Sequence, residues 1–186
     1  NVDQFRWLVR RDMQEQLRVA HEEIGARHVR AVGMFDDEMR VLALDPTTWR
    51  DKKRTPRLNW QIVDYVIESL LELGLKPMFT TTFVPTALAS GTQTVFSTRS
   101  NVTPPRDLAA WSQLVETAVR HAIEQFGAAE VRQWYFEVWN EPNLTAFWAG
   151  TREQFHALWQ ATYRAIKNVD AALRVGGPST ARAEWL

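Results

Sequence analysis

Four short apolar runs, rich in β-branched and aromatic residues, alternate along the chain with longer segments of helical periodicity. We predict strands at about residues 28–33, 77–82, 134–139 and 173–176. Helix-type apolar spacing occupies residues 12–25, 59–74, 107–127 and 151–169. Because short buried strands that alternate with helices form parallel βαβ units, the pattern predicts an α/β fold with a parallel sheet.

Residues typical of helix starts precede three of the helical segments. Asp12 with Glu15, and Thr151 with Gln154, have the spacing of a capping box. Asp107 is a third candidate N-cap. We therefore expect helices to begin at these three places.

Two architectures fit this order of elements: an open doubly wound sheet and a (β/α)8 barrel. A doubly wound sheet usually carries a glycine-rich phosphate loop, and the sequence contains neither G-x-G-x-x-G nor G-x-x-x-x-G-K-[ST]. Long loops follow the first two predicted strands, at about residues 35–57 and 83–106. Because the loops after the strands carry the chemistry of barrel enzymes, the barrel is favoured.

The chain is short for a complete barrel. Such a barrel has eight strands and usually about 250 residues, whereas this chain has 186 residues and four predicted strands. We interpret residues 1–186 as a fragment of a single (β/α)8 barrel domain. Since an open part of a barrel exposes sheet edges, we expect residues 1–186 alone to be poorly soluble and inactive.

The composition argues against several kinds of partner and site. Lysine plus arginine and aspartate plus glutamate both number 22, which leaves no basic surplus for nucleic acid or an anionic membrane. No apolar run has the roughly 18 residues of a membrane span. The absence of cysteine excludes thiolate metal sites, and the histidines lack metal-ligand spacing, so no metal is expected. For the acidic cluster Asp36, Asp37 and Glu38, solvated loop charge is favoured over hydrogen bonding at a substrate mouth.

The segment RQWYFEVWNEPNLTAFW, residues 132–148, carries the clearest chemistry, because a predicted strand runs directly into Asn140 and Glu141. Aromatic neighbours at the mouth of a strand would partly desolvate this carboxyl and favour its protonated form. A protonated carboxyl is the group that a departing glycosidic oxygen needs. The alternative is a surface glutamate in a turn above packed aromatic side chains. Composition alone favours core filling over sugar stacking for the nine tryptophans.

The stretch FEVWNEPN followed by FW closely resembles glycoside hydrolase family 39, the β-xylosidase and α-L-iduronidase group. Further similar segments are DMQEQLRVAHEEIGARHVR, GMFDDEM, FVPTALASGTQTVF, NVTPP and LRVGGP. The match favours the bacterial β-xylosidase branch. The resemblance implies a (β/α)8 TIM barrel of which this chain spans about strands 2–5, with strand 1 before Asn1 and strands 6–8 after Leu186.

The resemblance also implies roles for particular residues. Glu141 would be the general acid/base and Asn140 a contact to the sugar 2-hydroxyl, while the nucleophile glutamate would lie beyond Leu186. Phe83 matches an aromatic residue near the glycone site, with core packing an equal alternative. Val32 stands where the family often has a histidine, so a substrate contact from that histidine would be lost.

The function implied is that of a retaining exo-acting β-xylosidase. It would release xylose from short xylo-oligosaccharides by double displacement, with a small oligosaccharide as its partner and no cofactor. Another barrel glycosidase, such as an arabinosidase or iduronidase, and a non-catalytic carbohydrate-binding barrel are the alternatives. The oligomeric state stays open, as does the choice between bacterial cytoplasm and periplasm, since no signal-peptide pattern is present in a chain that begins at Asn1.

Overall fold

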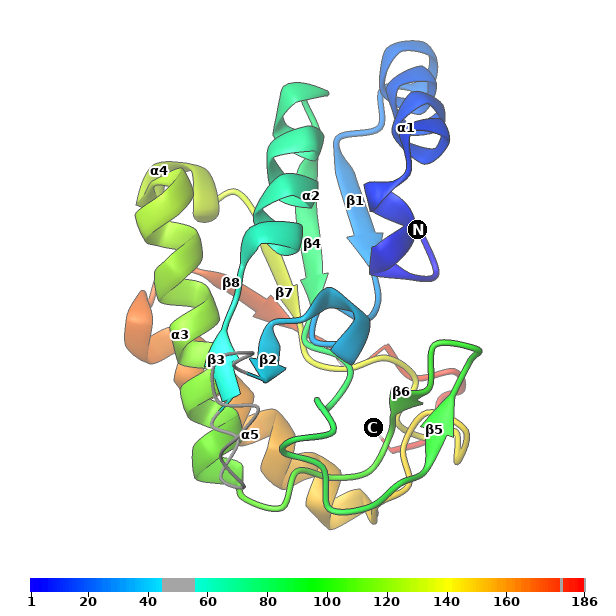
Figure 1. Ribbon diagram of the computed structural model, residues 1–186, viewed down its shortest axis with the longest axis vertical. Helices are drawn as coiled ribbons and strands as arrows, with labels where there is room; N and C mark the ends of the chain where they lie inside the picture. The colour runs from blue at the N-terminus through cyan, green and yellow to red at the C-terminus, as the bar shows by residue number, and fades with distance from the viewer. Residues whose placement is uncertain (45–55, 178, 186) are drawn as a thin grey trace.

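The structure is a computed structural model that describes residues 1–44, 56–177 and 179–185 (Figure 1). Its centre is a four-stranded parallel sheet with the strand order β1-β4-β7-β8. The strands are β1 (His28–Ala31), β4 (Lys76–Thr80), β7 (Tyr135–Glu137) and β8 (Arg174–Gly176). The prediction of four parallel strands, adjacent in chain order, is therefore confirmed.

All four strands are shorter than predicted, and after β1 other hydrogen bonds replace the sheet ladder. After β1, the Val32 carbonyl accepts a hydrogen bond from the Phe5 amide, and the Gly33 amide donates to the Thr82 hydroxyl. Single parallel bridges, Val2 with Ala31 and Asn140 with Ser179, extend the pairing beyond the strands.

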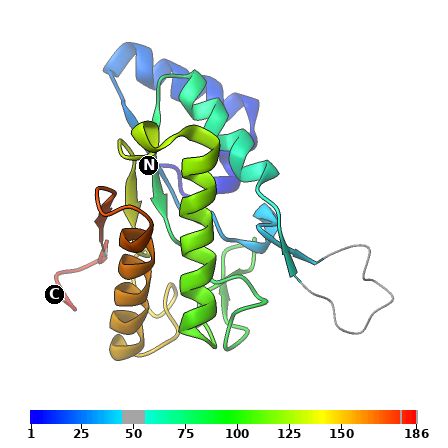
Figure 2. The ribbon, with the colours of Figure 1, turned by 90° about the vertical axis from the view of Figure 1, so that its left-hand side faces the viewer.

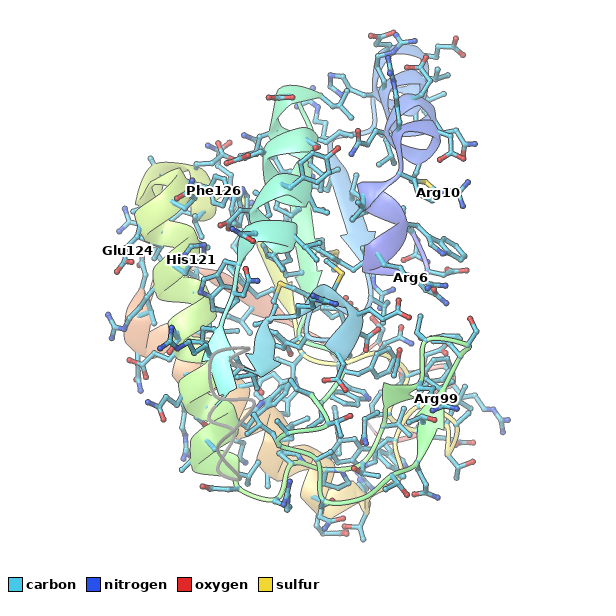
Figure 3. The ribbon with its side chains drawn as sticks, in the orientation of Figure 1. Arg6, Arg10, Arg99, His121, Glu124 and Phe126 are labelled. Atoms are coloured by element: carbon cyan, nitrogen blue, oxygen red, sulfur yellow. The ribbon has the colours of Figure 1, made fainter. Side chains whose placement is uncertain are left out.

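The long helices pack against one face of the sheet, where Figure 2 shows α3 and α5 side by side. The helices are α1 (Arg11–Ile24), α2 (Gln61–Glu72), α3 (Leu108–Phe126), α4 (Ala128–Val131) and α5 (Arg152–Val169). The indole of Trp111 donates to the Thr162 hydroxyl at 2.8 Å and joins α3 to α5. On α3, Glu124 points outward, whereas His121 faces α2 (Figure 3). Among the described residues, no helix combines the length and apolar character needed to cross a membrane.

Two of the three predicted helix starts are confirmed. The Asp107 side chain accepts a hydrogen bond from the Ala109 amide, and Thr151 with Gln154 forms a complete capping box. The capping box expected at Asp12 is wrong, because α1 begins at Arg11 and its N-cap makes no side-chain bond. The Asp12 carboxylate is instead engaged by the Arg10 guanidinium.

The two long loops contain short elements that the sequence did not predict. An antiparallel pair, β2 (Leu42–Leu44) with β3 (Pro56–Leu58), lies in the first loop, and the pair β5 (Thr94–Val95) with β6 (Ser100–Asn101) lies in the second. The described residues also form the 3-10 helices η1 (Phe5–Val9) and η2 (Asp37–Met39). Within the first predicted loop, residues 45–55 lie outside the described residues.

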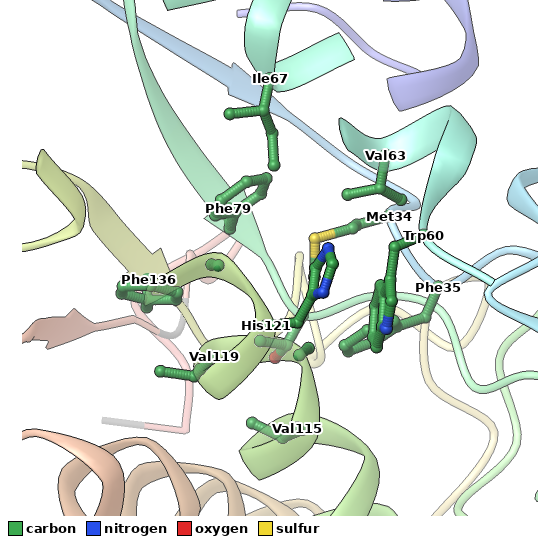
Figure 4. Close-up of a pocket in the computed structure, with 13 residues that line it drawn as sticks. Met34, Phe35, Trp60, Val63, Ile67, Phe79, Val115, Val119, His121 and Phe136 are labelled. Atoms are coloured by element: carbon green, nitrogen blue, oxygen red, sulfur yellow. The ribbon is translucent and has the colours of Figure 1, made fainter. Parts of the chain in front are cut away.

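Alternation along the strands gives the sheet two different faces. Phe79 and Phe136 point toward α2 and α3, where they border a small cavity of about 20 Å³ (Figure 4). His121, which also lines this cavity, stacks on Trp60 and forms a hydrogen bond with the Asp64 carboxylate. Because successive strand residues point to opposite faces, the polar residues that follow Phe79 and Phe136 point to the other side. The face of the sheet opposite α2 and α3 therefore carries the polar side chains of these strands.

Candidate active site

Asn140 and Glu141 lie in an open pocket of about 310 Å³ beside the carboxyl ends of β1 and β7. The pocket is lined by Asn1, Asp3, Arg30, Val32, Phe96, Asn140, Glu141 and Phe147. It brings Glu141 together with the end of β1 and with the loop that follows β4. This is the end of a parallel sheet at which barrel enzymes carry their reactive groups.

A fixed turn places Glu141 at the pocket. The Glu141 amide donates to the Ser179 carbonyl at 2.8 Å, and the Leu144 amide donates to the Glu141 carbonyl at 3.0 Å. Trp139 and Glu141 have φ angles of 69° and 46°, in the left-handed region that non-glycine residues seldom adopt. Such conformations persist where the surrounding contacts determine them, so the backbone holds the glutamate in place at some conformational cost.

A buried carboxylate lies below the pocket. Glu137 is 2% exposed, and its side chain accepts hydrogen bonds from Arg30 Nε at 2.7 Å, from Thr80 Oγ1 at 2.7 Å and from the Ser179 hydroxyl. Arg30 also donates through Nη2 to Asn140 Oδ1 at 2.8 Å. The amide of Asn140 is thus tied to the interior of the sheet.

The sequence interpretation missed Arg30 and Phe96 as residues of the pocket. Arg30 did leave a signal, since it is a charged residue between Val29 and Ala31 in an otherwise apolar strand. Phe96 left none: it is 40% exposed and contacts Phe147 edge to face at 5.6 Å between ring centroids. Its place in the pocket follows from the path of a long loop.

The aromatic surroundings expected for Glu141 are only partly present. Phe147 shares its pocket, but Phe136 faces the helices. Trp139 and Trp148 are buried and contact each other edge to face at 5.1 Å. Both indoles are satisfied by backbone carbonyls, which shows that these tryptophans fill the core and do not face a ligand.

Phe83 is not among the residues that line the pocket. It is 1% exposed and packs edge to face against Phe96 and Trp139. In the described part of the chain, Phe83 therefore has almost no exposed surface with which it could make the expected contact to a sugar. Its contact with Phe96 supports a ring that does line the pocket.

The acidic cluster after β1 is not simply solvated loop charge. Asp37 accepts a hydrogen bond from the Thr86 amide, and Glu38 pairs with Arg6. Asp36 accepts from the Ser100 hydroxyl at 2.8 Å, while its buried Oδ1 has no hydrogen-bond partner among the described residues. Burial raises the pKa of the Asp36 carboxyl to about 7, although the Ser100 hydrogen bond opposes this shift.

Asp36 should make the stability of the protein depend on pH. An aspartate in the unfolded chain titrates near pH 4. Because the pKa of Asp36 is higher in the folded protein, the stability that its protonated form contributes at acid pH is lost as the pH rises from about 4 through 7. Asp36→Asn should remove this part of the pH dependence and, at pH 8, raise the free energy of unfolding by about 1–3 kcal/mol. Urea unfolding of the full-length protein at pH 5 and pH 8 measures both effects. If the free energy of unfolding changed equally between pH 5 and pH 8 in the wild type and the variant, the raised pKa of Asp36 would be contradicted.

Among the described residues, no group of three or more histidine, aspartate or glutamate side chains is arranged to hold a metal ion.

The chain is similar to known proteins over nearly its whole length. The model of "Glycosyl hydrolases family 39" matches residues 5–186. A β-xylosidase of Caldicellulosiruptor saccharolyticus is 43% identical over 96% of this chain and 36% of its own length, and one of Geobacillus stearothermophilus is 39% identical over 92% and 34%. A solved β-xylosidase of this family from Caulobacter crescentus has a TM-score of 0.90 at 37% identity, covering 99% of this chain and 40% of that one.

The chain spans about a third of the length of the curated relatives it matches. The similar structures are TIM barrels, and the parallel sheet with its outer helices is part of such a barrel. With the family match extending over nearly all of its residues, the chain belongs to family 39 of the glycosyl hydrolases.

Proposed function

We propose that the full-length protein is a retaining exo-acting β-xylosidase that releases xylose from short xylo-oligosaccharides. The observation that carries this proposal is the position of Glu141, beside Asn140, in an open pocket at the carboxyl ends of parallel strands. The names of the similar proteins support xylosides as the substrate class. Residues 1–186 would be one part of a single catalytic barrel domain.

In this proposal Glu141 acts in both steps of a double displacement. It first gives a proton to the departing glycosidic oxygen, and it then takes a proton from the water that releases the sugar. A second carboxylate, about 5–5.5 Å away, forms the covalent intermediate, and we place this nucleophile beyond Leu186. Glu137 is unsuited to that role, because it is buried and its oxygens accept hydrogen bonds from three side chains.

Asn140 would hold a sugar hydroxyl next to the reacting carbon. Its side chain borders the same pocket as Glu141, and its Oδ1 is already occupied by Arg30. A small oligosaccharide is the only partner that this mechanism requires, because two carboxylates suffice for glycoside hydrolysis.

Hydrolysis assays on the full-length protein test the proposal. We expect release of 4-nitrophenol from its β-xyloside, slower release from the α-L-arabinofuranoside and the α-L-iduronide, and β-xylose as the first anomer seen by NMR. Faster hydrolysis of either alternative substrate would assign the site to another glycosidase. Xylo-oligosaccharide binding without turnover, unchanged in Glu141→Gln, would indicate a carbohydrate-binding barrel.

A further inference from the structure

Arg30 and Glu137 join all four strands of the sheet below the pocket. Arg30 comes from β1, Thr80 from β4 and Glu137 from β7, while Ser179 follows β8. The Arg30 side chain is 19% exposed and that of Glu137 only 3%. An ion pair this deeply buried requires good geometry and further hydrogen bonds to offset its desolvation, and Thr80 and Ser179 supply such bonds.

Arg30 uses its three nitrogens on three different acceptors. Nε donates to Glu137 at 2.7 Å, Nη1 to Asn1 Oδ1 at 3.0 Å and Nη2 to Asn140 Oδ1 at 2.8 Å. The ion pair with Glu137 fixes the plane of the guanidinium, which in turn fixes the direction of Nη2. The position of the Asn140 amide thereby depends on a carboxylate that does not touch the pocket.

The chemistry of arginine also determines which way the Asn140 amide faces. A guanidinium carries only donors, so it must meet the amide oxygen and not the NH2 group. With Oδ1 bound to Arg30, the Nδ2 group is the part of the amide left to interact with a ligand. Asn140 is therefore oriented as a hydrogen-bond donor before any substrate binds.

We propose that Arg30 and Glu137 are positioning residues that fix the Asn140 amide as a donor to a sugar hydroxyl oxygen. This inference rests on the proposed function, because it specifies how the same pocket recognises its sugar. It predicts that Arg30 acts on hydrolysis through Asn140 and makes no independent contribution.

The test uses variants of the full-length enzyme that avoid an unpaired buried charge. Arg30→Met with Glu137→Gln removes both charges of the pair while keeping side chains of similar size. Asn140→Ala removes the amide, and a triple variant combines all three changes. Lys76→Met with Glu130→Gln is the matched control, because it removes another partly buried pair at the start of β4, away from the pocket.

We expect the pair variant and Asn140→Ala each to lower kcat/KM on an aryl β-xyloside about 10- to 100-fold, as for loss of a hydrogen bond held by a charged group. The triple variant should lie within about threefold of Asn140→Ala, because residues that act as a unit are not additive. The pair variant and Asn140→Ala should both lose the preference for the xyloside over its 2-deoxy analogue, and the control should keep this preference. Multiplied losses in the triple variant, or a pair variant that behaves like the control, would overturn the inference.

Crystal structures of the pair variant and the control provide a readout that needs no activity. The Asn140 amide should leave its present orientation in the pair variant and keep it in the control. An unchanged amide in the pair variant would overturn the positioning role even if the enzyme proved to act on another sugar. If the wild type hydrolyses no xyloside while the amide moves as expected, only the proposed function fails.

Discussion

Replacing Glu141 by alanine in the full-length enzyme is expected to slow xylobiose hydrolysis about 10²- to 10⁴-fold, the usual contribution of a general acid. The leaving group of xylobiose is a poor one, and its oxygen needs the proton that Glu141 would supply. Formation of the glycosyl-enzyme from 2,4-dinitrophenyl β-xyloside should slow much less, because that leaving group departs without a proton. Steady-state kinetics on xylobiose and a pre-steady-state burst with the activated substrate measure the two effects.

The second step provides a control for this assignment. Without Glu141 as base, water attacks slowly and the covalent intermediate accumulates. Azide needs no base, so adding it should restore turnover and give the β-azide with retained configuration. An equal loss on both substrates, with no effect of azide, would show that Glu141 is not the acid/base and would favour a carbohydrate-binding role.

Trp139→Ala is expected to change the stability of the protein more than Asp36→Asn or Phe96→Ala. Its side chain is 0% exposed, it packs edge to face on Phe83 and Trp148, and its indole donates to the Phe147 carbonyl at 2.9 Å. Trp139→Ala should lower the free energy of unfolding by about 3–5 kcal/mol, because it leaves a large cavity below the pocket. Denaturant unfolding of the full-length protein is the measurement.

Phe96→Ala is the matched control for this substitution. Phe96 belongs to the same aromatic group, through its contacts with Phe83 and Phe147, but it is 40% exposed. Its removal should cost less than about 1 kcal/mol. A similar loss of stability in Phe96→Ala and Trp139→Ala would mean that the complete burial of Trp139 does not determine the cost of removing it.

Local patterns in the sequence determined the order of the elements and the position of Glu141. Apolar spacing predicts the four strands of the parallel sheet and the helices α1, α2, α3 and α5 from a few neighbouring residues, and the Thr151 and Asp107 caps are equally local. These predictions succeeded because the interactions behind them join residues close in the chain.

Local spacing did not decide every helix start. Asp12 and Glu15 have the same spacing as a working capping box, yet Arg10 binds Asp12 and Arg18 binds Glu15. A carboxylate engaged by a nearby guanidinium did not serve as the cap. The sequence shows which groups are near each other, whereas their competition is settled only by the conformation of the chain.

The tertiary structure decided which side chains meet at the pocket. Arg30 and Asn140 are 110 positions apart, and Asp36 and Ser100 are 64 apart. Whether such residues touch depends on the register of parallel strands and on the paths of the long loops, and a shift of one residue would turn every strand side chain to the opposite face. For the same reason the sequence located Glu141, but only the folded sheet shows that the amide of its neighbour Asn140 is held by an arginine from β1.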